Sequence, residues 1–275
     1  NFMSKQQIVL TILGVGLIIV LFSLPKVVVD NDGDMAEVPS ATQEENAGAE
    51  EIPGAHEVEL SDSDQQKIQY FKEQLKNPNN SAIFADSLAN TFLLVQQLDS
   101  VAKYADLLAE VDPSIEAKEK AGNYYYEAFG FAADDARAKK LGSKVQELLG
   151  EVLKANPDNL SAKSKIAMTY ISSPNPMQGI LMLREILEKD PDNKEALYNM
   201  GILSMQSAQY DKAVERLEKL LTIDPENIQA MFYLGVSYKE LGDKQKAKAW
   251  LIKAKETEND PAVSAAVDSY LQELN

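Results

Sequence analysis

The segment "ALYNMGILSMQSAQYDKAVERLEKLLTIDPEN" (residues 196–227) decides the fold of this chain. Two apolar or small-residue stripes in helical spacing run through it. They are Leu197, Met200, Gly201 and Ser204, followed by Ala213, Leu217 and Leu220. The polar "SAQYD" (207–211) separates the stripes, and proline at the end disfavours helical geometry at the residue before it. Asn227 then has the side chain of a helix N-cap. The segment therefore predicts two helices joined by a short turn, followed by the start of another helix.

Variants of the closing tetrapeptide recur along the chain. They are NPNN (77–80), DPSI (112–115), NPDN (156–159), DPDN (190–193) and DPEN (224–227). Their prolines are separated by 35, 44, 34 and 34 residues. A step near 34 residues is typical of helical repeat arrays, in which one unit cannot bury its apolar face alone and must stack on its neighbours.

These units resemble the tetratricopeptide repeat (TPR) family, and the match is most specific in "FYLGVSYKELGDKQKAKAWLIKAKE" (232–256) and in 196–227. The resemblance covers residues 80–260 in about four to five repeats, one of them with extra residues near 132–140 that predict longer helices. It implies an all-α superhelical solenoid whose concave groove is lined by the first helix of each pair. We expect a leading helix over 62–79 and a capping helix over 261–275.

The segment "IVLTILGVGLIIVLFSL" (8–24) is apolar except for Thr11 and Ser23. As a helix it would be about 25 Å long, just short of a ~30 Å hydrocarbon core, and flanking residues extend it. It lacks the cleavage site of a signal peptide and the charged face of an interfacial helix. A buried core helix would need other sequence to cover it all round, and an acidic linker follows it. We therefore predict a tail over 1–6 and a transmembrane anchor in the lipid bilayer over 7–29.

Flanking charge favours a cytoplasmic amino terminus, so that the repeats would lie in the periplasm at a bacterial inner membrane. Residues 30–61 are acidic and contain no aromatic residue, which predicts a disordered linker. The formal net charge of −16 argues against nucleic-acid binding. The absence of cysteine excludes disulfides and thiolate chemistry, and the single histidine, His56, lies in the acidic linker.

No nucleophile–base arrangement or phosphate-binding glycine loop is visible, so we expect neither an enzyme nor a cofactor or metal site. The TPR resemblance instead implies a peptide-binding groove. Its candidate residues are Met168, Tyr198, Ile202, Met205, Phe232 and Val236. Methionine and aromatic side chains suit an amphipathic helix or an unfolded segment as a partner. The alternative is that these side chains only pack against the adjacent repeat or the capping helix.

The combined features predict a membrane-anchored scaffold for protein–protein interaction that binds polypeptide segments as a chaperone-like accessory or assembly factor at the cell envelope. The layout resembles single-span periplasmic TPR proteins of the YfgM type, which are accessories of the Sec translocon. Two alternatives remain open at this point: a dedicated assembly factor for a system such as cytochrome c maturation, and an organellar import receptor.

Overall fold

The computed structural model describes residues 60–257 and 261–274. The predicted anchor over 7–29 and residues 30–59 of the predicted linker lie outside this part of the chain. The described residues form α-helices and one 3-10 turn, and they contain no strand, which confirms the all-helical fold. None of these helices combines the length and the apolar character that crossing a bilayer requires.

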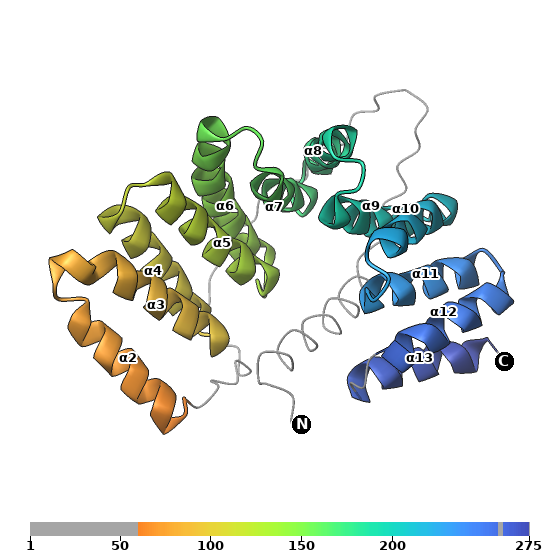
Figure 1. The fold of residues 1–275 in the computed structure, drawn as a ribbon, viewed down its shortest axis with the longest axis horizontal. Helices are drawn as coiled ribbons and strands as arrows, with labels where there is room; N and C mark the ends of the chain where they lie inside the picture. The colour runs from red at the N-terminus through yellow and green to blue at the C-terminus, as the bar shows by residue number, and fades with distance from the viewer. Residues whose placement is uncertain (1–59, 258–260, 275) are drawn as a thin grey trace, which may run out of the picture.

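The helices follow one another as hairpin pairs along an arc that runs from α2 at one end to α13 at the other (Figure 1). The first helices of the pairs are α3 (Ser81–Leu94), α5 (Ile115–Gly130), α7 (Leu160–Ile171), α9 (Lys194–Gln206) and α11 (Ile228–Glu240). The second helices are α4 (Leu98–Val111), α6 (Asp135–Ala155), α8 (Pro176–Lys189), α10 (Tyr210–Ile223) and α12 (Lys244–Thr257). The arc begins with α2 (Asp62–Gln74) and the 3-10 turn η1 (Pro78–Asn80), and ends with α13 (Pro261–Glu273).

The recurring tetrapeptides separate one pair from the next. Asparagine Oδ1 atoms accept hydrogen bonds from backbone amides at three helix starts: Asn159 from Ala162 at 3.0 Å, Asn193 from Ala196 at 3.0 Å, and Asn227 from Ala230 at 2.9 Å. Each bond pairs one of the amide groups that a helix start leaves without a partner. Helices α8 and α10 end immediately before an Asp-Pro pair. The asparagine caps predicted from the sequence are thus confirmed.

The first two tetrapeptides act differently. Asn77 accepts from the Asn79 amide at 3.1 Å and begins η1, so that α3 starts without a side-chain cap. At the second, Ser114 takes the capping position of α5 and accepts from the Ala117 amide at 3.2 Å.

Small residues allow the two helices of a pair to approach closely. A Cβ atom added to Gly179 on α8 would lie 2.2 Å from the Ala167 carbonyl oxygen on α7, so the two backbones are nearly in contact there. At Gly201 on α9, the added atom would lie 3.0 Å from a side-chain carbon of Leu217 on α10. All residues of the two stripes in 196–227 are buried, as their spacing predicts.

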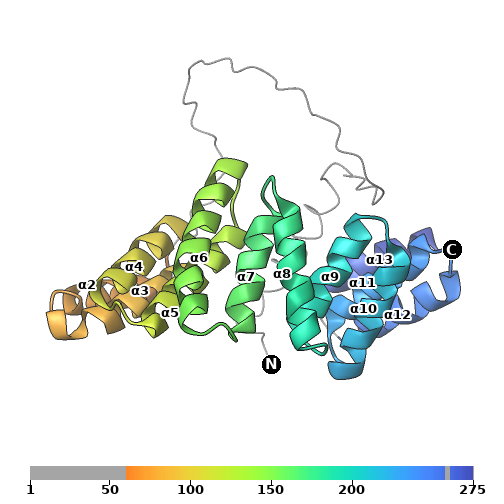
Figure 2. The ribbon, with the colours of Figure 1, turned by 90° about the horizontal axis from the view of Figure 1, so that it is seen from above.

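The second pair is longer than the others. Helices α5 and α6 have 16 and 21 residues, whereas the other paired helices have 12 to 14. The Asp134 carboxylate caps α6 by accepting from the Arg137 amide at 2.8 Å, and the extra residues of this repeat extend the amino-terminal end of α6. Figure 2 shows α6 projecting beyond its neighbours.

Candidate protein-binding surface

The first helices form the inner, concave face of the arc (Figure 1). Helix α3 contacts α5, α7 contacts α9, and α9 contacts α11. In the described part of the chain, the second helices of neighbouring pairs do not contact one another to the same extent. Side chains join these helices: the Tyr124 hydroxyl donates to the Asp86 carboxylate at 2.6 Å, and Lys165 Nζ donates to Asn123 Oδ1 at 2.8 Å. We call the surface formed by α3, α5, α7, α9 and α11 the concave face.

The six residues predicted to line a groove all belong to these first helices. They are Met168 on α7, Tyr198, Ile202 and Met205 on α9, and Phe232 and Val236 on α11. The first four are half-buried, so part of each side chain remains open to solvent. Tyr198 also packs toward the next repeat, with its ring centroid 6.1 Å from that of Tyr233.

Phe232 and Val236 are buried, with exposed fractions of 4% and 2%. The Phe232 ring contacts the Tyr270 ring of α13 at a centroid distance of 5.3 Å, and Val236 belongs to the same core cluster as Val267 of α13. Lys239 on α11 forms an ion pair with Glu273 at 2.6 Å. Phe232 and Val236 therefore pack against the capping helix, which was the alternative to a groove position.

Polar groups that the sequence reasoning did not select lie on the same first helices. They are Tyr126 and Glu127 on α5, Ser164 on α7, and Glu195 on α9. Ser164 is only 1% exposed, and its hydroxyl has no hydrogen-bond partner among the described residues. Glu195 and Tyr126 are half-buried. The signal that could have found Ser164 and Tyr126 is the repeat register, because Ser164 shares its position with Tyr198 and Tyr126 shares its position with Met205. Glu195 lies one turn before Tyr198 in α9.

The charges of these groups influence one another. Burial raises the pKa of Glu195, while the nearby Ser164 hydroxyl and the Lys165 ammonium lower it in part. Desolvation by the surrounding protein raises the pKa of Glu127, although solvent still reaches its side chain, and Lys165 again opposes the shift. Burial, followed by the negative charges of Glu195 and Glu127, raises the pKa of Tyr126. One cation, Lys165, thus acts on both carboxylates.

Among the residues that the structure describes, Lys165 forms no ion pair with either carboxylate. Its Nζ donates to Asn123 Oδ1 at 2.8 Å and to Ser161 Oγ at 3.3 Å. A guanidinium or ammonium group placed beside Glu127 and Glu195 would offset their negative charges. Within the described residues, no group of three or more His, Cys, Asp or Glu side chains could hold a metal ion.

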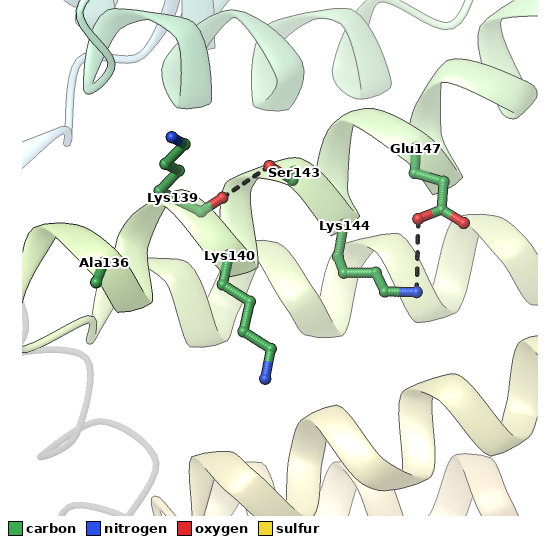
Figure 3. A pocket seen from close by; sticks show the side chains of 6 residues that line it. All are labelled: Ala136, Lys139, Lys140, Ser143, Lys144 and Glu147. Atoms are coloured by element: carbon green, nitrogen blue, oxygen red, sulfur yellow. Dashed lines mark hydrogen bonds and ion pairs between the residues drawn. The ribbon is translucent and has the colours of Figure 1, made fainter.

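A second polar feature lies on the opposite row of helices. The exposed side of α6 carries an open hollow of about 420 Å³ (Figure 3). Its lining consists of Ala136, Lys139, Lys140, Ser143, Lys144 and Glu147. Lys144 forms ion pairs with Glu147 at 3.5 Å and with Asp106 of α4 at 3.4 Å. One helix supplies the whole lining, so the hollow is a basic stretch of surface and not an enclosed site.

Comparison with known proteins identifies the repeats. A family model described as tetratricopeptide repeat matches residues 175–221 and 204–269. Residues 175–269 thus carry tetratricopeptide repeats. The matched segments include α8 to α12, and the preceding helices α3 to α7 continue the same paired arrangement. No protein of curated function matches the sequence significantly.

Solved structures similar to this chain have low sequence identity. MamA is 19% identical with a TM-score of 0.48 and covers 66% of this chain and 93% of its own. YrrB, described as a TPR protein with an unusual peptide-binding site, is 19% identical with a TM-score of 0.44 over 74% of this chain and 99% of its own. Yeast Tom70 is 16% identical with a TM-score of 0.60 over 78% of this chain, which spans 44% of the Tom70 chain. The Tom70 likeness shows a shared fold, and the YfgM-type layout stays a prediction.

Proposed function

We propose that this chain is a membrane-anchored TPR scaffold that binds polypeptide segments on its concave face, as a chaperone-like accessory or assembly factor at the cell envelope. The observation that carries the proposal is the half-buried apolar row of Met168, Tyr198, Ile202 and Met205 on two successive first helices. These side chains are accessible in part, in contrast to Phe232 and Val236.

The geometry of the row suits an amphipathic partner. Tyr198, Ile202 and Met205 are spaced by four and three residues, so they lie on one side of α9 along about 10 Å of its length. A helical partner presents an apolar stripe with the same spacing. Methionine has an unbranched and polarisable side chain, which adapts to partners of different shape.

The predicted anchor would hold this surface at the membrane. Residues 7–29 would span the bilayer and residues 30–61 would connect it to α2, so that the concave face has a high effective concentration toward membrane-bound partners. We place the TPR repeats in the periplasm of a bacterial cell, with the amino terminus in the cytoplasm. Flanking charge supports this orientation.

Site-specific photo-crosslinking of the full chain in native membranes tests the binding surface. A photoreactive residue at Ile202 or Met205 should yield crosslinked polypeptides. The control is Leu181 on the second helix α8, which is also apolar and is 51% exposed. Equal products from Leu181 and from the two α9 positions would reject the concave face as the binding surface.

The anchor and its orientation need a separate test. The chain contains no cysteine, so Ser63→Cys and Ser4→Cys each introduce a single thiol. A membrane-impermeant maleimide applied to intact spheroplasts should label only the Ser63→Cys variant. Labelling of Ser4→Cys alone would reverse the topology, and extraction of the chain by carbonate would exclude a spanning anchor.

A further inference from the structure

We propose that the concave face between α5, α7 and α9 holds a subsite for a lysine or arginine side chain of the bound segment, formed by the Glu127 and Glu195 carboxylates beside the Tyr126 and Ser164 hydroxyls. The inference rests on the proposed peptide-binding function, and it names the chemistry that the partner must carry. Three first helices contribute to the subsite, so its geometry depends on the stacking of the repeats.

Contacts between helices bring these groups together. The bond from Lys165 Nζ to Asn123 Oδ1, at 2.8 Å, connects α7 to the part of α5 that carries Tyr126 and Glu127. Ser164 precedes Lys165 in α7, and its hydroxyl is close enough to Glu195 of α9 to affect the carboxylate. Both Glu127 and Glu195 are influenced by the single ammonium of Lys165.

The subsite adjoins the apolar row. Tyr198 follows Glu195 by three residues in α9, and Met168 follows Ser164 by four residues in α7. Residues at these separations are neighbours on one side of a helix. A bound segment that places an apolar side chain on Met168 and Tyr198 would therefore bring an adjacent basic side chain to Glu195.

The Ser164 hydroxyl has unused bonding capacity. The Ser164 hydroxyl is 1% exposed and has no hydrogen-bond partner in the described part of the chain, a rare state for a buried polar group. It is available to donate to Glu195 and to hold that carboxylate in place, which makes Ser164 a positioning residue. Lys165 Nζ already bonds to Asn123 and Ser161.

The electrostatics select a cation as the ligand. Burial raises the pKa of Glu195, desolvation raises that of Glu127, and both negative charges raise the pKa of Tyr126 beyond the effect of its own burial. An arriving guanidinium or ammonium has only donors, which match two carboxylates and a phenolic oxygen. The same charges would repel an anionic group such as a peptide carboxylate.

The test uses the full chain in lipid nanodiscs and a displayed library of random dodecapeptides. Three proteins are compared: the wild type, the double variant Glu127→Gln/Glu195→Gln, and the control Glu147→Gln on α6. Glutamine keeps the shape of glutamate and removes only its charge, and thermal denaturation checks that each variant folds. A fourth protein, Ile202→Asp, impairs the apolar row.

We expect wild-type binders to combine apolar residues with lysine or arginine. Replacing that basic residue by norleucine should weaken wild-type binding about tenfold or more, the range for a hydrogen bond to a charged group. The double variant should lose the preference, so that it binds the basic peptide and its norleucine counterpart with nearly equal affinity. The Glu147→Gln control should keep the preference.

The outcomes separate the subsite from the proposed function. Binders that depend on Ile202 but show no preference for basic residues would overturn the subsite and leave the peptide-binding function intact. A basic preference that persists in the double variant would also overturn it, because the charge would then be recognised elsewhere. Failure of the wild type to enrich any peptide over Ile202→Asp would reject the proposed function itself.

Discussion

The Phe232 ring of α11 meets the Tyr270 ring of α13 edge to face, with 5.3 Å between the ring centroids and 84° between the planes. The pair joins the last complete repeat to the capping helix. Ion pairs flank it, from Lys239 to Glu273 at 2.6 Å and from Lys255 to Asp268 at 2.6 Å. Helix α13 thus takes the place of a further repeat, and it buries a part of α11 that the sequence had suggested for ligand binding.

Tyr270→Ala should expose this part of α11. We expect the free energy of unfolding to fall by about 1–3 kcal/mol, because the substitution removes an aromatic contact over a buried core. Binding of a hydrophobic dye should increase at the same time. Tyr70→Ala is the control, since Tyr70 is 53% exposed. It should change the free energy of unfolding and the dye binding less than Tyr270→Ala does. An unchanged melting temperature for Tyr270→Ala would show that α13 does not stabilise the array.

Gly179→Ala should be one of the most destabilising small substitutions in the chain. The new methyl group would lie 2.2 Å from the Ala167 carbonyl oxygen, and a backbone atom cannot move aside as a side chain can. We expect a loss of about 1–3 kcal/mol in chemical denaturation. Gly150→Ala in α6 meets nothing within 4 Å and should instead gain about 0.5–1 kcal/mol. A neutral Gly179→Ala would mean that α7 and α8 are not in close contact.

Asn193→Ala removes the cap of α9. The lost bond to the Ala196 amide measures 3.0 Å, and its loss should cost about 0.5–2 kcal/mol in the free energy of unfolding. The matched control is Asn80→Ala, since Asn80 precedes α3 and makes no side-chain cap bond. If both variants lost equal stability, capping would not be the reason for the asparagine at position 193.

Local sequence predicts the helix boundaries of this chain, but it does not predict which helices bury a given residue. Asn227 and the Asp-Pro before it determine a helix boundary through neighbouring residues, so the boundaries can be read from the sequence. The burial of Phe232 depends on the residues after Pro261, which no local pattern connects to α11. The influence of both Glu195 and Glu127 on Tyr126 likewise depends on how α5, α7 and α9 stack, and only the repeat register suggested that these helices share a face.

Glu195→Gln should make the chain more stable at neutral pH. Burial raises the pKa of Glu195 in the folded state, so its ionised form costs stability. This cost appears as the pH rises from the unfolded pKa, about 4.3, through the folded pKa, and it is absent at lower pH. The melting temperature of the variant should therefore exceed that of the wild type at pH 7, and the difference should shrink toward zero by about pH 4. A difference independent of pH would contradict an ionisation effect.

Burial differs between the amino-terminal helix and the last repeat of the described solenoid. Helix α2 has one buried residue, Ile68, whereas α11 is buried continuously from Ala230 to Tyr238. In a stack where each unit touches only its neighbours, resistance to unravelling varies from unit to unit. A mechanical load applied at residue 60 would detach α2 first and then shed helices in sequence, and it would reach the continuously buried α11 late. Tension on the amino-terminal side would therefore lengthen the molecule stepwise, and the helices before α9 would unravel before the apolar row on α9 was disturbed.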